Sequence, residues 1–153
     1  MITKINGLQN LGLASYEMSV SIGLAQRAFK TLLATCLGHQ GLTIPKWTLL
    51  GYLYRNGSTR PFEAARKLGM KPPYIAKLLP QLESEGLIVM VNFADDGRGK
   101  SISLSAEGRK LVEQVEVMLI RCINDQLKDV SQDDIRTYFE MTQYISNNVK
   151  HHE

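Results

Sequence analysis

The side chains with the most informative chemistry are hydrogen-bond donors that recur on one side of the segment 72–84. These donors are Lys71, Tyr74, Lys77 and Gln81. No carboxylate interrupts the series before Glu83. Because phosphates attract such donors and repel acidic groups, this polar face suits a nucleic acid. On the second helix of a helix-turn-helix, with Pro73 at its start, the face would enter the major groove of DNA. An ordinary solvated helix surface is the alternative.

A second group of polar side chains lies in a turn-like segment, 95–100. Asp96 and Gly97 favour a turn, and Arg98 and Lys100 follow it. An arginine at the tip of a hairpin can enter a narrow minor groove, where negative potential is focused. Asp96 is close enough in sequence to bond the guanidinium of Arg98 and hold it extended, and Lys100 would contact phosphates. The alternative is an ordinary polar β-turn.

Apolar periodicity predicts the helices that position the first group. The segments 61–68 and 72–84 both repeat apolar residues at helical spacing, and Gly69 separates them. Ala64 and Ala65 are small enough to let two helices cross closely. The sequence therefore predicts a helix-turn-helix.

The flanking segments predict a hairpin and a further helix beside this motif. The segment 87–93 is rich in β-forming residues, and 102–104 alternates apolar and polar side chains, so the two predict a two-stranded hairpin. A helix is expected from about Pro45, which suits a first helical position, to Asn56-Gly57. Together these elements predict a winged helix-turn-helix over 44–104.

Longer apolar stripes occupy both ends of the chain. The first repeats at intervals of four and three and consists of Met18, Ile22, Ala25, Phe29, Leu32 and Cys36. It predicts a helix of about 22 residues that ends at Gly38. Ser105 is a plausible cap for a helix over 105–128 that is apolar on two sides, and Ser131 for a last helix. A single domain of this size can hardly cover all these faces, so we expect 12–40 and 105–150 to form a dimer.

Length and composition agree with one globular domain over 1–153. The 153 residues are 44% hydrophobic and 22% charged, which excludes disordered and collagen-like classes. The absence of a run of 18 apolar residues predicts no membrane span, and the polar residues within 1–13 argue against a signal peptide. The fold class expected is mainly α with a small β-hairpin wing.

Charge is distributed unevenly, although the net charge of +3 is small. Residues 1–54 carry an excess of three positive charges and residues 55–110 an excess of four, whereas residues 111–153 carry an excess of four negative charges. This asymmetry suggests that one face meets a polyanion and another meets something else.

Three motifs together resemble the MarR (multiple antibiotic resistance regulator) family. They lie at 64–69, 78–88 and 96–108, and the most specific part is Asp-x-Arg at 96–98 followed by Leu-Ser-x-x-Gly at 104–108. The resemblance covers about 44–110 by motif, and nearly the whole chain by element order. It implies a homodimeric winged-helix transcription regulator that binds double-stranded DNA, commonly as a repressor.

The resemblance also implies a small, often aromatic or anionic effector that releases DNA, bound between the dimerisation and DNA-binding parts. The candidates for lining its pocket are Met18, Phe29, Trp47, Tyr54 and Met118. Core packing is the commoner role for each of these residue types. No other cofactor and no metal are expected, and a regulator of this family would work in the bacterial or archaeal cytoplasm at the nucleoid.

The prolines of the segment 72–84 depart from the family pattern. Pro80 cannot donate to the carbonyl of Ala76, and an interior proline costs about 3 kcal/mol. We therefore expect a kink near Pro80, or a helix that ends early. Pro72-Pro73 removes backbone and hydroxyl donors from the start of the helix. These prolines motivate an alternative function, a winged-helix protein-interaction module without DNA binding.

Other chemistry is weakly supported. The segment 94–101 matches a relaxed phosphate-loop pattern, but a strand follows where a helix is required. Cys36 and Cys122 are far apart in the sequence and are expected to be free, inert thiols. The three histidines lack metal-ligand spacing. No spacing suggests a catalytic triad, so we expect no enzyme.

Overall fold

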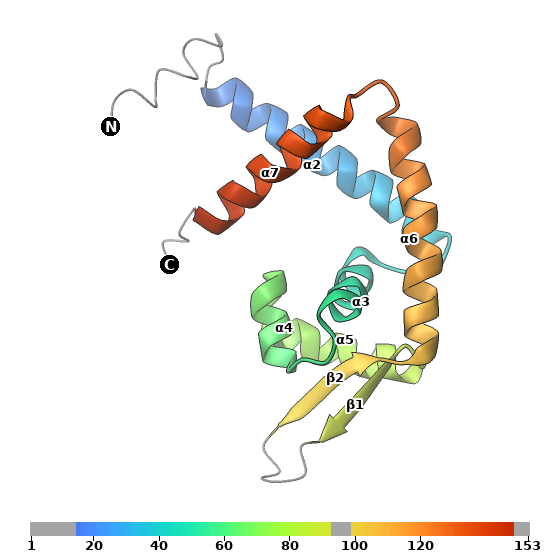
Figure 1. The fold of residues 1–153 in the computed structure, drawn as a ribbon. Coiled ribbons are helices and arrows are strands. Elements are labelled where there is room, and N and C mark those ends of the chain that lie inside the picture. The colour runs from blue at the N-terminus through green and yellow to red at the C-terminus, as the bar shows by residue number, and fades with distance from the viewer. Residues whose placement is uncertain (1–14, 93–98, 149–153) are drawn as a thin grey trace. The chain divides into compact units, whose positions relative to one another are not determined.

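The computed structural model describes residues 15–92 and 99–148. Its elements are α2 (Ser15–Gly38), α3 (Ile44–Asn56), α4 (Pro61–Leu68), α5 (Pro72–Ser84), β1 (Ile88–Asn92), β2 (Lys100–Leu104), α6 (Ala106–Gln126) and α7 (Gln132–Asn148) (Figure 1). A first compact unit ends at Leu119, and a second begins at Ile120. The mainly helical fold with a hairpin wing is confirmed.

Helix α3 begins and ends as its sequence predicts. The side-chain hydroxyl of Thr43 accepts a hydrogen bond from the Lys46 backbone N–H, and Pro45 lies in the first turn. Gly57 ends the helix at a φ of 74°, a conformation that favours glycine, and donates its N–H to the carbonyl of Leu53. Thr43, Pro45 and Gly57 are therefore sufficient to explain both ends.

The helix-turn-helix of α4 and α5 is also confirmed. Gly69 adopts a left-handed φ of 62° between the two helices, and the next N–H, of Met70, returns to the carbonyl of Ala65 at 2.9 Å. Ala64 and Ala65 are buried, as close packing of the two helices requires. The core face of α5 consists of Ile75, Leu78, Leu79 and Leu82.

Helix α5 runs without interruption through Pro80 to Ser84, so the expectation of an early end is wrong. Pro80 and Ala76 are both exposed, and water can therefore solvate the Ala76 carbonyl that Pro80 leaves without a donor. Buried residues on both sides of Pro80, among them Leu79 and Leu82, hold the helix against the core. The kink stays a prediction.

The wing is an antiparallel pair, β1 and β2, whose register aligns Ile88 with Leu104 and Asn92 with Lys100. Thr59 adds a bridge that the sequence did not indicate. Its N–H and C=O exchange hydrogen bonds of 3.0 and 2.9 Å with the backbone of Ile102, whose side chain is fully buried. The loop between α3 and α4 therefore anchors the wing to the helices.

A glycine joins the wing to α6. The Ser105 hydroxyl accepts from the N–H of Gly108 at 2.9 Å and donates to the Gly86 carbonyl at 2.6 Å. A Cβ on Gly108 would lie 2.0 Å from the carbonyl oxygen of Leu87, so only glycine fits here. The Leu-Ser-x-x-Gly motif thus combines a helix cap with a close backbone contact.

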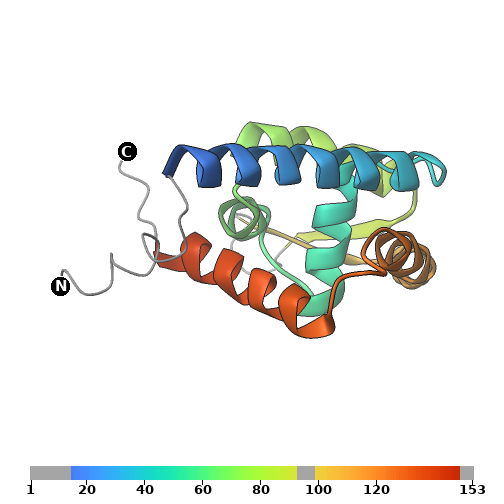
Figure 2. The same cartoon turned by 90° about the horizontal axis from the view of Figure 1, so that it is seen from above.

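The core of the first unit lies where α2, α3, α5, β2 and α6 meet. Helix α3 contacts α2, α4 and β2, and it crosses α2 (Figure 2). The largest fully buried side chains are Leu37, Leu49, Leu50, Leu53, Ile75, Leu82, Ile102 and Val115. Helix α3 contributes three of them, which makes it the central packing element.

The apolar stripes at the ends of the chain remain exposed. On α2 only Cys36 and Leu37 are buried, while Phe29 is 47% exposed. Described separately, α7 begins at its Ser131 cap, whose hydroxyl accepts from the Asp134 N–H at 3.1 Å, and buries no residue at all. Each of these helices therefore presents apolar side chains at its surface.

The expectation of free thiols is wrong. No cysteine among the described residues is free, and both Cys36 and Cys122 are in the disulfide-bonded form. The expectation depended on the sequence alone, which does not determine whether a thiol is oxidised in the folded chain.

Candidate nucleic-acid interface and a cavity

The donor side chains predicted on α5 are all exposed, on the side of the helix away from its buried residues. Tyr74 is 45% exposed, and the donors Lys71, Lys77 and Gln81 are likewise at the surface, as is Pro73, which offers no donor. We call these five residues the α5 polar face. The packing of α4 against α5 positions it.

The first turn of α5 offers no backbone donor to an anion. Pro72 and Pro73 have no N–H, and the amides of Tyr74 and Ile75 both donate to the carbonyl of Lys71, at 2.9 and 3.2 Å. The start of a helix ordinarily supplies free N–H groups for a phosphate. At this helix, contacts to an anion must therefore come from side chains.

The wing supplies Lys100, which is exposed at the first position of β2. Asp96 and Arg98, the other two predicted wing residues, lie outside the described residues. Their segment joins β1 to β2, which the register places opposite each other up to the pair Asn92 and Lys100.

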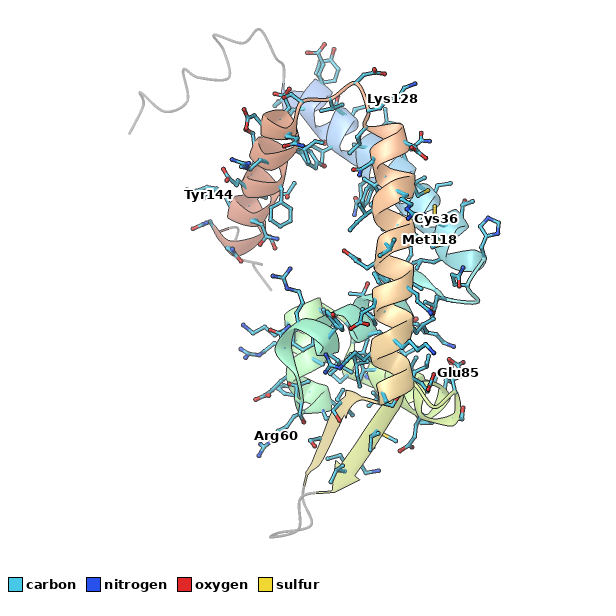
Figure 3. All side chains as sticks on the ribbon, turned by 45° about the vertical axis from the view of Figure 1, so that its right-hand side comes forward. Cys36, Arg60, Glu85, Met118, Lys128 and Tyr144 are labelled. Atoms are coloured by element: carbon cyan, nitrogen blue, oxygen red, sulfur yellow. The ribbon has the colours of Figure 1, made fainter. Side chains whose placement is uncertain are left out.

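Acidic groups near the α5 polar face are few and partly compensated. Glu85, which caps the end of α5, forms an ion pair with Lys46 at the start of α3. Figure 3 shows Glu85 on the side of α6, with Arg60 on the opposite side of the winged-helix region. Glu63 accepts a hydrogen bond from Thr59 at 3.3 Å. The surface around α4 and α5 therefore keeps a positive balance.

A small apolar hollow of about 380 Å³ lies beside the α5 polar face. It is bordered by α4, α5 and both strands, and its lining includes Phe62, Pro72, Ala76, Pro80 and Met90, with Lys100 as its charged member. This hollow was not predicted from the sequence, because its walls come from segments that are far apart in the chain.

A larger cavity of about 830 Å³ lies between α2, α3 and α6. Helix α3 contributes Trp47, Tyr54 and Arg55, and α6 contributes Glu113 and Glu116. The rest of its lining is mainly apolar and includes Leu33, Ile44, Val112 and Val117. We call this space the α3–α6 cavity. Apolar walls with a few polar groups are typical of small-molecule sites.

Among the residues that line the cavity, Tyr54 contacts two charged side chains. Its hydroxyl donates to the Glu113 carboxylate at 3.1 Å, and the Arg109 guanidinium lies over its ring, 5.4 Å from the centre. The hydrogen bond to Glu113 and the negative charge of that carboxylate raise the pKa of Tyr54, and Arg109 opposes them. Tyr54 is therefore held neutral as a hydrogen-bond donor.

The structure brings only part of the predicted pocket set together. Trp47 and Tyr54 line the α3–α6 cavity, whereas Met18 and Phe29 are exposed on α2 and line no part of it. Met118 instead lies beside the end of α2 (Figure 3), where its sulfur accepts from the Gln40 amide at 3.7 Å. The charged members of the lining were not predicted, because side chains from α3 and α6 meet only in the folded chain.

Metal clusters and membrane-spanning helices are both absent from the described part of the chain. Residues 15–92 and 99–148 contain no group of three or more His, Cys, Asp and Glu side chains that could hold a metal ion. Within the same ranges, no helix has the length and hydropathy needed to cross a membrane.

The sequence is similar to known transcription regulators. Residues 40–99 match the model of the MarR family. Over 103 residues the chain is 29% identical to the HTH-type transcriptional regulator FarR of Neisseria gonorrhoeae, a match that covers 66% of this chain and 70% of that protein. This match extends beyond the winged-helix region alone.

Solved structures share the fold. The crystal structure of NadR in complex with 4-hydroxyphenylacetate is 20% identical, with a TM-score of 0.74, and covers 90% of this chain and 96% of that one. That of CouR from Rhodococcus jostii bound to p-coumaroyl-CoA is 17% identical, with a TM-score of 0.77, and covers 87% and 94%. The helix-turn-helix, the wing and the match at residues 40–99 therefore agree, and the chain is similar to the MarR family of winged-helix transcription regulators.

Proposed function

We propose that this regulator is a sequence-specific, dimeric repressor that binds a pseudo-palindromic operator in double-stranded DNA. The observation that carries the proposal is the α5 polar face, which presents donors without a carboxylate next to the wing. Donors in this arrangement can reach both base edges and phosphates in a major groove.

Different side chains take different parts in this binding. Lys77, Gln81 and Tyr74 meet base edges, while Lys71 contacts a phosphate in place of the missing backbone donors. Arg98 enters the minor groove, oriented by Asp96, and Lys100 contacts the adjacent phosphate. Because the first turn of α5 has no free N–H, phosphate binding depends more on lysines here than at an ordinary helix start.

Dimerisation follows from the apolar faces that the chain leaves uncovered. Helix α7 buries none of its 17 residues, and α2 leaves Phe29 and Ile22 exposed. A second copy of the chain covers these faces, through 12–40 and 105–150. Two α5 helices spaced about 34–36 Å apart then read half-sites roughly one turn of DNA apart.

The α3–α6 cavity is the proposed effector site. NadR and CouR, which share the fold, are described with 4-hydroxyphenylacetate and p-coumaroyl-CoA bound, respectively. In this chain α3 contacts α4 and β2, so an occupant that displaces α3 also displaces the DNA-binding elements. A small aromatic molecule in the cavity would therefore weaken operator binding, and the regulator would act in the cytoplasm at the nucleoid.

Fluorescence anisotropy with the DNA upstream of its own gene, against a scrambled duplex at two salt concentrations, tests the proposal. We expect binding at least about 10³-fold tighter to the operator, with a steep salt dependence. Lys77→Ala should lower operator affinity, whereas Lys128→Ala, at an exposed site outside the winged-helix region, should not. Equal, weak binding to both duplexes would contradict operator recognition.

One observation favours a different function. The apolar hollow beside Pro72 and Pro80 could receive an apolar side chain of a partner protein, and the prolines remove donors that DNA binding normally uses. A winged-helix interaction module of this kind would show little salt-dependent affinity for any duplex, and a pull-down would then recover its partner.

A further inference from the structure

The α3–α6 cavity has charged side chains in its lining. Glu113 and Glu116 are three residues apart on α6, so they lie on the same side of that helix, and both line the cavity. Arg55, from the last turn of α3, is the only cation in the lining that the structure describes. The lining therefore carries one net negative charge.

The two carboxylates differ in their partners. Glu113 already accepts the hydrogen bond from Tyr54, which leaves its second oxygen available. Among the described residues, Glu116 and Arg55 take part in no hydrogen bond or ion pair with each other or with any neighbour. The cavity thus contains carboxylate oxygens that the protein itself does not neutralise.

Aromatic rings face the same space. Trp47 and Tyr54 line the cavity from α3, and the face of an electron-rich ring attracts a cation. The Arg109 guanidinium lies over the Tyr54 ring, 5.4 Å from its centre, which is the geometry of such a contact. Carboxylates together with aromatic faces are the combination that binds a protonated amine.

From this lining we infer that the effector of the α3–α6 cavity is a small aromatic amine that carries a positive charge. Its ammonium group would lie between Glu113 and Glu116, and its ring would pack against Trp47 and the apolar walls. Within the lining, an anionic ligand would have one arginine to bind and two carboxylates to oppose it. This inference rests on the proposed function only in naming the cavity as the effector site.

The chain contains a single tryptophan, Trp47, and it lines the cavity, so its fluorescence reports occupancy directly. Two probes separate charge from shape. Tyramine and 4-hydroxyphenylacetate share a phenol ring and differ in bearing an ammonium or a carboxylate group. In titrations of the full chain without DNA, tyramine should bind at least about 10-fold more tightly.

Isosteric variants locate the source of the preference. Glu113→Gln and Glu116→Gln keep the size of each side chain, and the amide oxygen introduced by Glu113→Gln can still accept from Tyr54. Each should reduce tyramine affinity by about 5-fold to 10-fold and leave 4-hydroxyphenylacetate binding equal or tighter. Glu107→Gln, on the same helix but outside the lining, should change neither. Unfolding curves establish that all three variants are folded.

Three results would overturn the inference: equal or tighter binding of 4-hydroxyphenylacetate, no response to either probe up to about 10 mM, or an unchanged preference in both glutamine variants. Operator binding is measured separately by anisotropy, so the two failures can be distinguished. A chain that binds operator without the charge preference refutes this inference alone, whereas one that prefers tyramine but binds no duplex refutes the proposed regulator.

Discussion

At the scale of single residues, Gly108 is a position that leaves no room for a side chain. Gly108→Ala places a methyl group against the Leu87 carbonyl, which must move, so we expect the free energy of unfolding to fall by about 1–3 kcal/mol or more. Urea denaturation measures it. Gly23→Ala is the matched control, because its new Cβ would make only an ordinary contact of 3.9 Å with the Arg27 side chain, apart from neighbouring helix backbone, and alanine favours a helix. Equal losses in both variants would contradict the contact at Gly108.

The raised pKa of Tyr54 leads to a prediction about how stability depends on pH. Its pKa is raised because the hydrogen bond to Glu113 and the charge of that carboxylate favour the neutral phenol. A raised pKa in the folded state means that the stabilisation is complete below the ordinary pKa of 10.0 and is lost as pH rises through the folded pKa. Glu113→Gln should lower that pKa towards its usual value, which absorbance of tyrosinate measures. An unchanged titration curve would contradict the coupling.

Sequence reasoning succeeded with residues whose role is local and failed with those whose role depends on distant neighbours. The caps Ser105 and Ser131 were predicted from a few adjacent letters, because each hydroxyl bonds an N–H three residues on. The hydrogen bond between Tyr54 and Glu113 was not predicted, because the two residues are 59 positions apart in the sequence. No local pattern indicates which side chains from α3 and α6 will share a cavity.

At the scale of elements, Pro80 is the feature whose cost can be measured. Pro80→Ala restores the N–H that the Ala76 carbonyl lacks and removes the crowding of the ring. An interior proline costs about 3 kcal/mol, partly offset by its effect on the unfolded chain, so we expect a gain of about 1–2 kcal/mol in unfolding free energy. Thermal unfolding tests this. Pro72→Ala, at the first helical position where proline is favourable, should give no gain.

Element boundaries were predictable because proline and glycine mark them chemically. Prolines lie in the first turns of α3, α4 and α5, and Gly57 and Gly69 end two of these helices. The continuation of α5 beyond Pro80 was not predictable from local preference, since packing of Leu82 decides it. The Thr59 bridge to Ile102 likewise depends on tertiary contact, because one residue carries no strand pattern.

At the scale of the whole molecule, the exposed apolar side chains of α2 and α7 lead us to expect that two copies of the chain form a dimer. Phe139→Glu places a charge on an α7 side chain that is 60% exposed in the single chain. If a second copy covers it, burial of that charge should weaken the dimer by about 100-fold or more. Sedimentation velocity measures the shift to monomer, and circular dichroism checks folding. Glu140→Gln, at the next residue, is the control. A Phe139→Glu protein that dimerises normally would exclude α7 from the interface.

The proposed dimer would also determine how much each phosphate contact contributes to DNA affinity. Lys71→Ala removes one contact per chain and therefore two per dimer, so the slope of log K against log salt should decrease by about 2, since each lost contact contributes about 0.9. Lys71 contacts a phosphate in this proposal, so affinity should fall about equally for operator and scrambled duplex. Lys77→Ala should instead lose about 1–3 kcal/mol on the operator alone. Because Pro72 and Pro73 leave α5 without free amides, no backbone contact can replace Lys71. An unchanged salt slope in Lys71→Ala, with normal operator affinity, would mean that α5 meets the DNA through another face.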